Sequence, residues 1–85
     1  MKIYKDGYMF VAPSKKQFKK YDVYKDGDYI TSFGDKRYGQ YHDKISSYYR
    51  VLDNKDPMRR KAYYSRHPYN YGKDSADYMA KHYLW

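Results

Sequence analysis

Two stretches of the chain place β-forming residues on both sides of an Asp-Gly pair. The tetrapeptide Tyr-Lys-Asp-Gly occupies residues 4–7 and recurs at residues 24–27. Asp-Gly is typical of two-residue hairpin loops, because the type I′ turn needs a positive φ at both central positions. The second copy therefore predicts a hairpin with strands at residues 20–25 and 28–33, and the first copy predicts a shorter one within residues 3–11.

The second hairpin has a defined expected register. A two-residue loop pairs opposite charges, two aromatic rings and two β-branched side chains, all favourable cross-strand neighbours. The expected pairs are Lys25 with Asp28, Tyr24 with Tyr29, and Val23 with Ile30. Phe33 then shares a face with the paired tyrosines, and Tyr21 shares the opposite face with Val23. The register therefore predicts a hairpin that is apolar on both faces.

Residues 40–52 have the spacing of an amphipathic helix. Apolar and aromatic side chains recur every three or four residues, at Tyr41, Ile45, Tyr48, Tyr49 and Leu52. This spacing predicts a helix. Two serines and the β-branched residues in the segment have lower helix propensity and weaken the prediction.

Two later helices have clearer boundaries. Asp56 can cap a helix with its carboxylate and Pro57 fits the first helical position, which predicts a helix from Pro57 to Arg66 or His67 that stops before Pro68. Asp74 or Ser75 caps a last helix that continues to about residue 83. Its apolar stripe is Ala76, Met79, Ala80 and Tyr83.

These elements predict an α+β fold with one or two short β-hairpins followed by two or three short helices. Residues 1–18 are expected to be a basic N-terminal extension with a possible short hairpin, and residues 19–85 a small α+β domain. The charge supports this division. The first twenty residues hold six lysines and one aspartate, a charge of +5, whereas the other 65 residues carry twelve basic and nine acidic groups, or +3. We expect such an arm to be mobile unless a partner binds it.

The composition raises a question about tyrosine. Leu, Ile, Val and Phe together make up only 11 of 85 residues, which with a net charge of +8 would be typical of a disordered chain. The 15 tyrosines argue against disorder, because disordered chains are poor in aromatic residues. We expect about half of them in a modest core and the others on contact surfaces.

Several functional classes are disfavoured by the same sequence. Without cysteine there is no disulfide framework, zinc ribbon or thiol nucleophile. No apolar run approaches the roughly 18 residues of a membrane span, and the first residues lack the apolar core of a signal peptide. The histidines, His42, His67 and His82, have no metal-ligand spacing. No catalytic constellation stands out, so we expect a protein that is not an enzyme and uses no cofactor, metal or small-molecule substrate.

Basic and aromatic residues are the candidates for binding a partner. Lysine and arginine can pair with acidic protein or with phosphates, and tyrosine and tryptophan provide rigid contact area or stack on unpaired bases. The basic candidates are Lys15, Lys16, Lys19, Lys20, Arg59, Arg60, Lys61 and Arg66. The aromatic candidates are Tyr8, Tyr69, Tyr71 and Trp85. Composition alone does not distinguish an acidic protein from a nucleic acid.

An ordered series of short motifs resembles a family of small basic proteins of large double-stranded DNA viruses, which includes members in algal viruses, mimivirus relatives and some phages. The resemblance covers about residues 19–85 and leaves Met1 to Phe18 outside. The motifs are residues 20–24, Ser32-Phe33-Gly34-Asp35, Tyr38, residues 41–44, Asp56-Pro57, residues 59–67 and Tyr83-Leu84-Trp85. The family has no settled activity, so the resemblance implies a viral, virion-associated protein but no catalytic residues.

The resulting functional hypothesis is a non-enzymatic structural protein of a large DNA virus particle. It would be a minor capsid or cement-type component that binds larger capsid or other virion proteins through tyrosine-rich and basic surfaces. It would reside in the virion, and in the host cell during assembly. The alternative is a DNA-binding or genome-packaging protein that uses the same basic groups on phosphates, and a third possibility is a regulator of host proteins.

Overall fold

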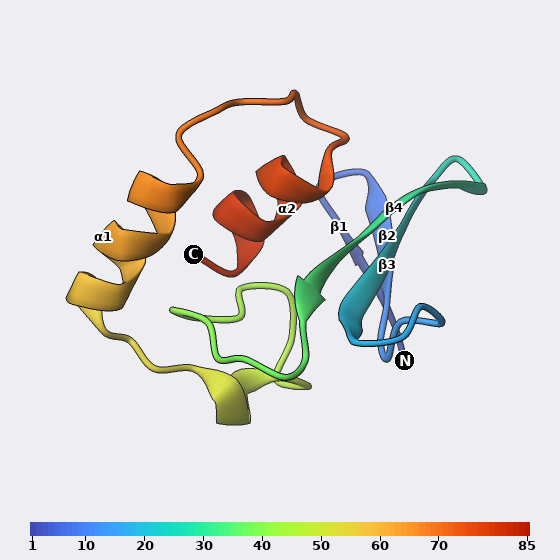
Figure 1. Ribbon diagram of the computed structural model, residues 1–85. Helices are drawn as coiled ribbons and strands as arrows, with labels where there is room; N and C mark the ends of the chain where they lie inside the picture. Colours follow the sequence, from blue (N-terminus) through green and yellow to red (C-terminus); the bar gives the residue numbers. More distant parts are fainter.

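The computed structural model describes residues 1–85 and contains one four-stranded antiparallel sheet followed by short helices (Figure 1). The strands are β1 (Lys2–Lys5), β2 (Tyr8–Val11), β3 (Lys19–Lys25) and β4 (Asp28–Asp35), in the spatial order β1-β2-β3-β4. A short 3₁₀ helix, η1 (Arg50–Leu52), precedes the helices α1 (Pro57–Arg66) and α2 (Ala76–Tyr83). The predicted α+β class, with short hairpins followed by short helices, is confirmed.

Both Asp-Gly pairs form the predicted hairpin turns. Asp6 and Gly7 have φ of 55° and 82°, and Asp26 and Gly27 have φ of 52° and 84°. Positive φ at both central positions is the signature of the type I′ turn, whose twist matches that of the strands it joins. The turns close β1 on β2 and β3 on β4.

A bulge in the second hairpin changes which residues face the core. The pairs nearest the turn are as expected, but Val23 pairs with Thr31 rather than Ile30, because the register shifts between Val23 and Tyr24. Side chains alternate between the faces of a strand, so one extra residue moves the rest of β4 to the other face. Phe33 therefore lies beside Tyr21, with ring centroids 5.7 Å apart. The opposite face carries the hydrogen-bonded polar pair of Ser32 and Asp22, so the expectation of two apolar faces is wrong.

Residues 1–18 are an integral part of the sheet rather than a separate extension. β2 pairs with β3, and Phe10 is completely buried. Two hydrogen bonds join this hairpin to the region of α2: Tyr8 OH donates to Asp74 (2.9 Å), and Tyr83 OH donates to Asp6 (2.8 Å). The five lysines before Lys20 are exposed, so the positive charge of this segment is compatible with its packing on the core.

The core is largely aromatic. Of the 15 tyrosines, four are buried, four are half-buried and seven are exposed. The four buried ones are Tyr8, Tyr21, Tyr49 and Tyr83. Phe10 lies among them, with its ring centroid 4.9 Å from that of Tyr83 and 6.2 Å from that of Tyr21, both in edge-to-face arrangements. Such pairs are favourable beyond the area they bury, which helps to explain how the chain forms a core with few aliphatic residues.

The predicted helix at residues 40–52 is wrong except for its last turn, η1. Asp43 is fully buried, and its carboxylate accepts hydrogen bonds from the amides of Ile45 (2.8 Å) and Ser46 (3.1 Å). The Ser46 hydroxyl in turn accepts from the Tyr48 amide. Side-chain acceptors of this kind compete with helical backbone bonds, and here they hold the segment in consecutive turns. Ile45 and Tyr49 still face the core, so the apolar spacing identified buried positions but not a helix.

The two predicted helix starts are confirmed. Asp56 caps α1 by accepting from the Met58 and Arg59 amides, and Pro57 occupies its first position. Ser75 caps α2 by accepting from the Tyr78 amide. α2 lies between the sheet and α1, and α1 forms the outer edge of the molecule (Figure 1).

Candidate binding surface

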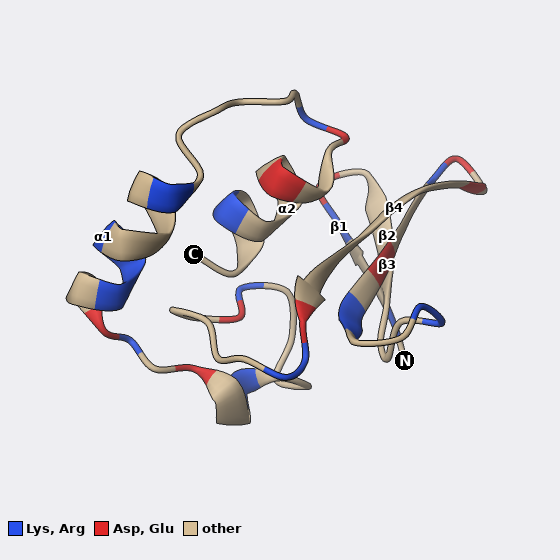
Figure 2. Cartoon of the chain, viewed as in Figure 1, with Lys and Arg blue, Asp and Glu red and all other residues tan.

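The α1 surface, defined by Arg59, Arg60, Lys61 and Arg66, is the most strongly basic element of the structure. Its helix has no buried residue. Basic residues are spaced along the helix and are coloured blue on the ribbon in Figure 2. Arg59 lies 3.6 Å from Asp56, an exposed contact that is worth little, and Lys61 and Arg66 have no ion pair within the chain. The helix therefore presents cations that an outside partner can reach.

α1 is held to the rest of the molecule by aromatic and cationic contacts. Tyr63 stacks on Trp85 with ring centroids 4.5 Å apart and an interplanar angle of 5°. Arg60 donates from Nε to the Trp85 carbonyl (2.7 Å), and its guanidinium lies over the ring of Tyr41. Burial raises the pKa of Tyr63 to about 12. Arg60 and Trp85, both candidates for partner binding, therefore position α1 within the chain.

We predict that Trp85→Ala loosens α1 without unfolding the sheet. The substitution removes the stacking partner of Tyr63 and should lower the local stability of α1 by about 1–2 kcal/mol, since aromatic pairs contribute about 0.5–1.5 kcal/mol beyond burial. Amide hydrogen exchange should show faster exchange at residues 60–66 and unchanged exchange in β3. Tyr71→Ala, which removes an exposed ring, is the matched control. Equal protection of α1 in the wild type and Trp85→Ala would contradict this role.

A groove between the end of the sheet and the helices brings several candidates together. This sheet–helix groove has a volume of about 550 Å³, and its lining includes Lys19, Arg66, Tyr71 and Trp85. Gly34, at φ +76°, forms part of the lining, and a Cβ at this position would lie 3.0 Å from the side chains of Leu84 and Lys20. Glycine therefore allows β4 and the segment after α2 to approach closely.

The carboxylates of the groove are already paired. Arg37 donates to Asp35, with a 2.8 Å contact, and holds the pKa of Asp35 down to about 2. Asp77 lies 2.9 Å from the amine of Lys81. The positive charges of Lys19 and Arg66 are therefore not neutralised by the acidic groups beside them.

Two of the candidate residues are buried and cannot reach a partner. The Lys20 amine lies inside the molecule and donates to the Tyr38 carbonyl (3.0 Å) and to the Gln40 side chain. Burial lowers the pKa of Lys20 to about 8, against the opposing influence of nearby aspartates. Tyr8 is buried and hydrogen-bonded to Asp74. Their residue types alone did not indicate this burial, because it depends on which segments pack over each face of the sheet.

The remaining candidates are dispersed. Lys15 and Lys16 are exposed on the loop between β2 and β3, on the side of the molecule away from α1 (Figures 1 and 2). The Lys16 amine lies over the ring of Tyr29, 5.4 Å from its centroid. Tyr69 and Tyr71 are exposed on the loop between α1 and α2, with ring centroids 6.2 Å apart. The candidates therefore do not form one continuous surface.

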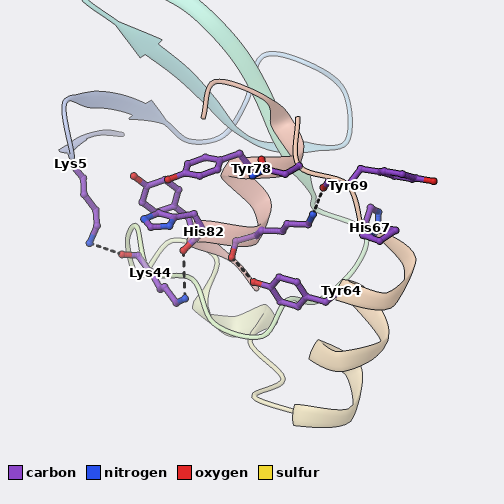
Figure 3. Close-up of a pocket in the computed structure, with 11 residues that line it drawn as sticks. Lys5, Lys44, Tyr64, His67, Tyr69, Tyr78 and His82 are labelled. Atoms are coloured by element: carbon purple, nitrogen blue, oxygen red, sulfur yellow. Dashed lines mark hydrogen bonds between the residues drawn. The ribbon is translucent and has the colours of Figure 1, made fainter. Parts of the chain in front are cut away.

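Sequence reasoning missed a second hollow, which we call the lysine–tyrosine cleft. It has a volume of about 650 Å³ and is lined in part by Lys5, Lys44, Lys81, His67, His82 and Tyr69 (Figure 3). These residues come from the end of β1, the segment after β4, the loop after α1, and α2. They are scattered along the chain, so no local motif could have revealed the cleft.

One imidazole–carboxylate pair is present. His42 Nδ1 lies 2.6 Å from Asp53, whose other oxygen accepts from Gln40 and from the Asp43 amide. Burial raises the pKa of Asp53, but these hydrogen bonds outweigh it and leave the pKa below its usual value. The pair links the two ends of the segment at residues 40–53, which is a structural role.

The structure has no group of three or more histidine and acidic side chains that could hold a metal ion. None of its helices combines the length and apolar character needed to cross a membrane. Comparison of the chain with family models, curated proteins and solved structures gives no match.

Proposed function

We propose that this protein is a non-enzymatic structural component of a large DNA virus particle, of the minor capsid or cement type. The viral context is supported by the resemblance of residues 19–85 to proteins of such viruses. The binding role is supported by one observation above others: α1 has no buried residue and carries cations without partners in the chain. An exposed helix of this kind is well suited to an acidic surface on a larger shell protein.

The rim of the sheet–helix groove adds apolar contact to this charge. Tyr71 and Trp85 lie there beside Arg66. Tyrosine, tryptophan and arginine are the residues most often found at the energetic centre of protein interfaces, because they combine large rigid area with hydrogen bonding. A partner that covers α1 and the groove would meet cations and aromatic rings on one side of the molecule.

A triple substitution, Arg59→Gln, Lys61→Gln and Arg66→Gln, tests the α1 surface. Glutamine keeps helix propensity while removing three charges. Binding to DNA-free shells should weaken about tenfold or more, because each exposed ion pair contributes up to about 1 kcal/mol. Sedimentation with shells purified from the infected host measures it. The matched control removes the same charge elsewhere, at Lys2, Lys36 and Lys73, and should bind as the wild type does.

The shell proposal and the genome-packaging alternative predict different distributions of the protein. If it is a shell component, quantitative mass spectrometry should find it in DNA-free shells at the same ratio to the major shell protein as in full particles. Its recovery only from DNA-filled particles, together with unchanged shell binding by the triple variant, would overturn the proposal. The basic groups of α1 would then be assigned to phosphates instead.

A further inference from the structure

The lysine–tyrosine cleft has an uncompensated positive charge. Three lysines and two histidines line it, and no carboxylate does. The Lys5 amine donates only to the Lys44 carbonyl (3.2 Å), and the Lys44 amine donates only to the His82 carbonyl (3.5 Å). Each ammonium has three donors, so both keep hydrogen-bonding capacity for a ligand, and neither forms an ion pair within the chain. These contacts are drawn as dashed lines in Figure 3.

Lys81 has a different role in the cleft. Its amine forms an ion pair with Asp77 (2.9 Å) and donates to the Tyr69 carbonyl (2.6 Å). The amine therefore holds the backbone of the loop after α1, and this contact places Tyr69 at the rim (Figure 3). Tyr69 is 67% exposed.

A stacked pair of rings also lines the cleft. Tyr78 and His82 stack with ring centroids 5.3 Å apart, and both line the hollow. Figure 3 shows these two rings near Lys5 and Lys44, whereas Tyr69 lies at the other end of the cleft with its ring directed away from the lysines. The cleft thus has free ammonium groups at one end and an exposed aromatic ring at the other.

We propose that the lysine–tyrosine cleft binds a single-stranded nucleic acid. Lys5 and Lys44 contact phosphates of the strand, and an unpaired base farther along the strand stacks on Tyr69. The volume, about 650 Å³, lies within the usual range of small-ligand sites. A carboxylate ligand would use the lysines but not the exposed ring, and a base in a duplex has no free face for stacking, so the combination favours an unpaired nucleotide. This site is separate from the α1 surface and does not depend on it.

Fluorescence anisotropy with a labelled single-stranded oligothymidylate tests the site. The Lys5→Gln, Lys44→Gln double variant should bind about tenfold or more weakly, because each substitution removes a hydrogen bond to a charged group. The slope of log affinity against log salt should fall by about 1.4, since each phosphate that is no longer neutralised accounts for about 0.7. Tyr69→Ala should weaken binding without changing the salt slope. Tyr69→Phe keeps the ring and should bind as the wild type does.

The controls separate this site from general charge effects. A Lys2→Gln, Lys36→Gln variant loses the same charge outside the cleft and should bind as the wild type does. The triple variant of α1 and its matched control should bind the oligonucleotide equally, so failure at the cleft and failure of the proposed shell contact are distinguishable. AMP should compete much more weakly than the unlabelled oligonucleotide, because a single nucleotide occupies only one end of the cleft.

Three outcomes would overturn the proposal. The first is equal binding by the wild type and the Lys5→Gln, Lys44→Gln variant, with both folded by circular dichroism. The second is an equal loss in the Lys2→Gln, Lys36→Gln control. The third is competition by duplex DNA or polyglutamate as strong as that by the single strand, which would assign the cleft to polyanions in general.

Discussion

Replacing Asp43 by alanine is expected to lower the free energy of unfolding by about 3 kcal/mol or more, because it leaves buried donors without acceptors. The Asp43 carboxylate is fully buried and accepts from Tyr21 OH (2.6 Å) and from the Ile45 and Ser46 amides. Small domains have only about 5–15 kcal/mol in total. The variant should therefore be largely unfolded under mild destabilising conditions.

Urea denaturation followed by circular dichroism measures this loss. Asp28→Ala is the matched control, since Asp28 lies exposed at the second hairpin turn, and a change there should stay within about 0.5 kcal/mol. Tyr21→Phe removes the one side-chain donor to the Asp43 carboxylate, so a double-mutant cycle with Asp43→Ala should show coupling between the two positions. Equal stability of Asp43→Ala and the wild type would refute the assignment of Asp43 as the organising group of its segment.

The protein is expected to unfold steeply above pH 10. Burial raises the pKa of Tyr8, Tyr21, Tyr49, Tyr63 and Tyr83, and Asp74, Asp43 and Asp6 raise it further for Tyr8, Tyr21 and Tyr83, respectively. In the unfolded chain these tyrosines ionise near pH 10, whereas in the fold they remain protonated. The unfolded state then binds fewer protons, so the stability present below pH 10 is lost as pH rises, by up to about 1.4 kcal/mol per pH unit for each tyrosine.

Lys20 has the opposite effect on the free energy of unfolding, and this effect occurs at lower pH. Its pKa falls from 10.5 to about 8 in the fold. Between these values the unfolded chain holds the proton that the folded chain has released, so this residue makes the free energy of unfolding rise with pH. Above 10.5 both states are neutral and its contribution is constant. The tyrosines then determine the alkaline limit.

Tyrosinate absorbance and near-ultraviolet circular dichroism together test the alkaline transition. The buried tyrosines should ionise in the same pH interval in which the native dichroism is lost. Tyr49→Phe removes one ionisable group and should move the midpoint to higher pH, whereas Tyr71→Phe, at an exposed ring, should not. Native dichroism that persists when all 15 tyrosines are ionised would contradict this account.

Local chemistry in the sequence predicted the turns and helix starts correctly. Asp-Gly defines both hairpins, and Asp56-Pro57 and Ser75 define the helix starts, because each signal acts through neighbouring backbone atoms. Prediction from local chemistry failed for the segment at residues 40–52. Its apolar spacing is helical, but the buried carboxylate of Asp43 satisfies the backbone amides instead. Whether this carboxylate is buried depends on Tyr21, which is far away in the sequence.

The binding surfaces were less predictable than the fold. Residue type correctly marked Lys61, Arg66, Tyr69 and Tyr71 as exposed. It could not show that Lys20 and Tyr8 are buried, since that depends on which segments pack over each face of the sheet. The lysine–tyrosine cleft was missed entirely because its three lysines lie on segments that only the tertiary fold brings together.

The two bonds between tyrosine and aspartate that join the first hairpin to the region of α2 have a consequence for the folding pathway. They connect residues 66 and 77 positions apart in the chain. The hairpins can form quickly from local contacts, but the face that carries Phe10 stays open until the last helix arrives, and closing such long loops is slow. Removal of α2 would leave that aromatic face uncovered, and a sheet exposed in this way is prone to aggregate. The earliest and latest parts of the chain must therefore be joined before Phe10 and its neighbours are protected from water.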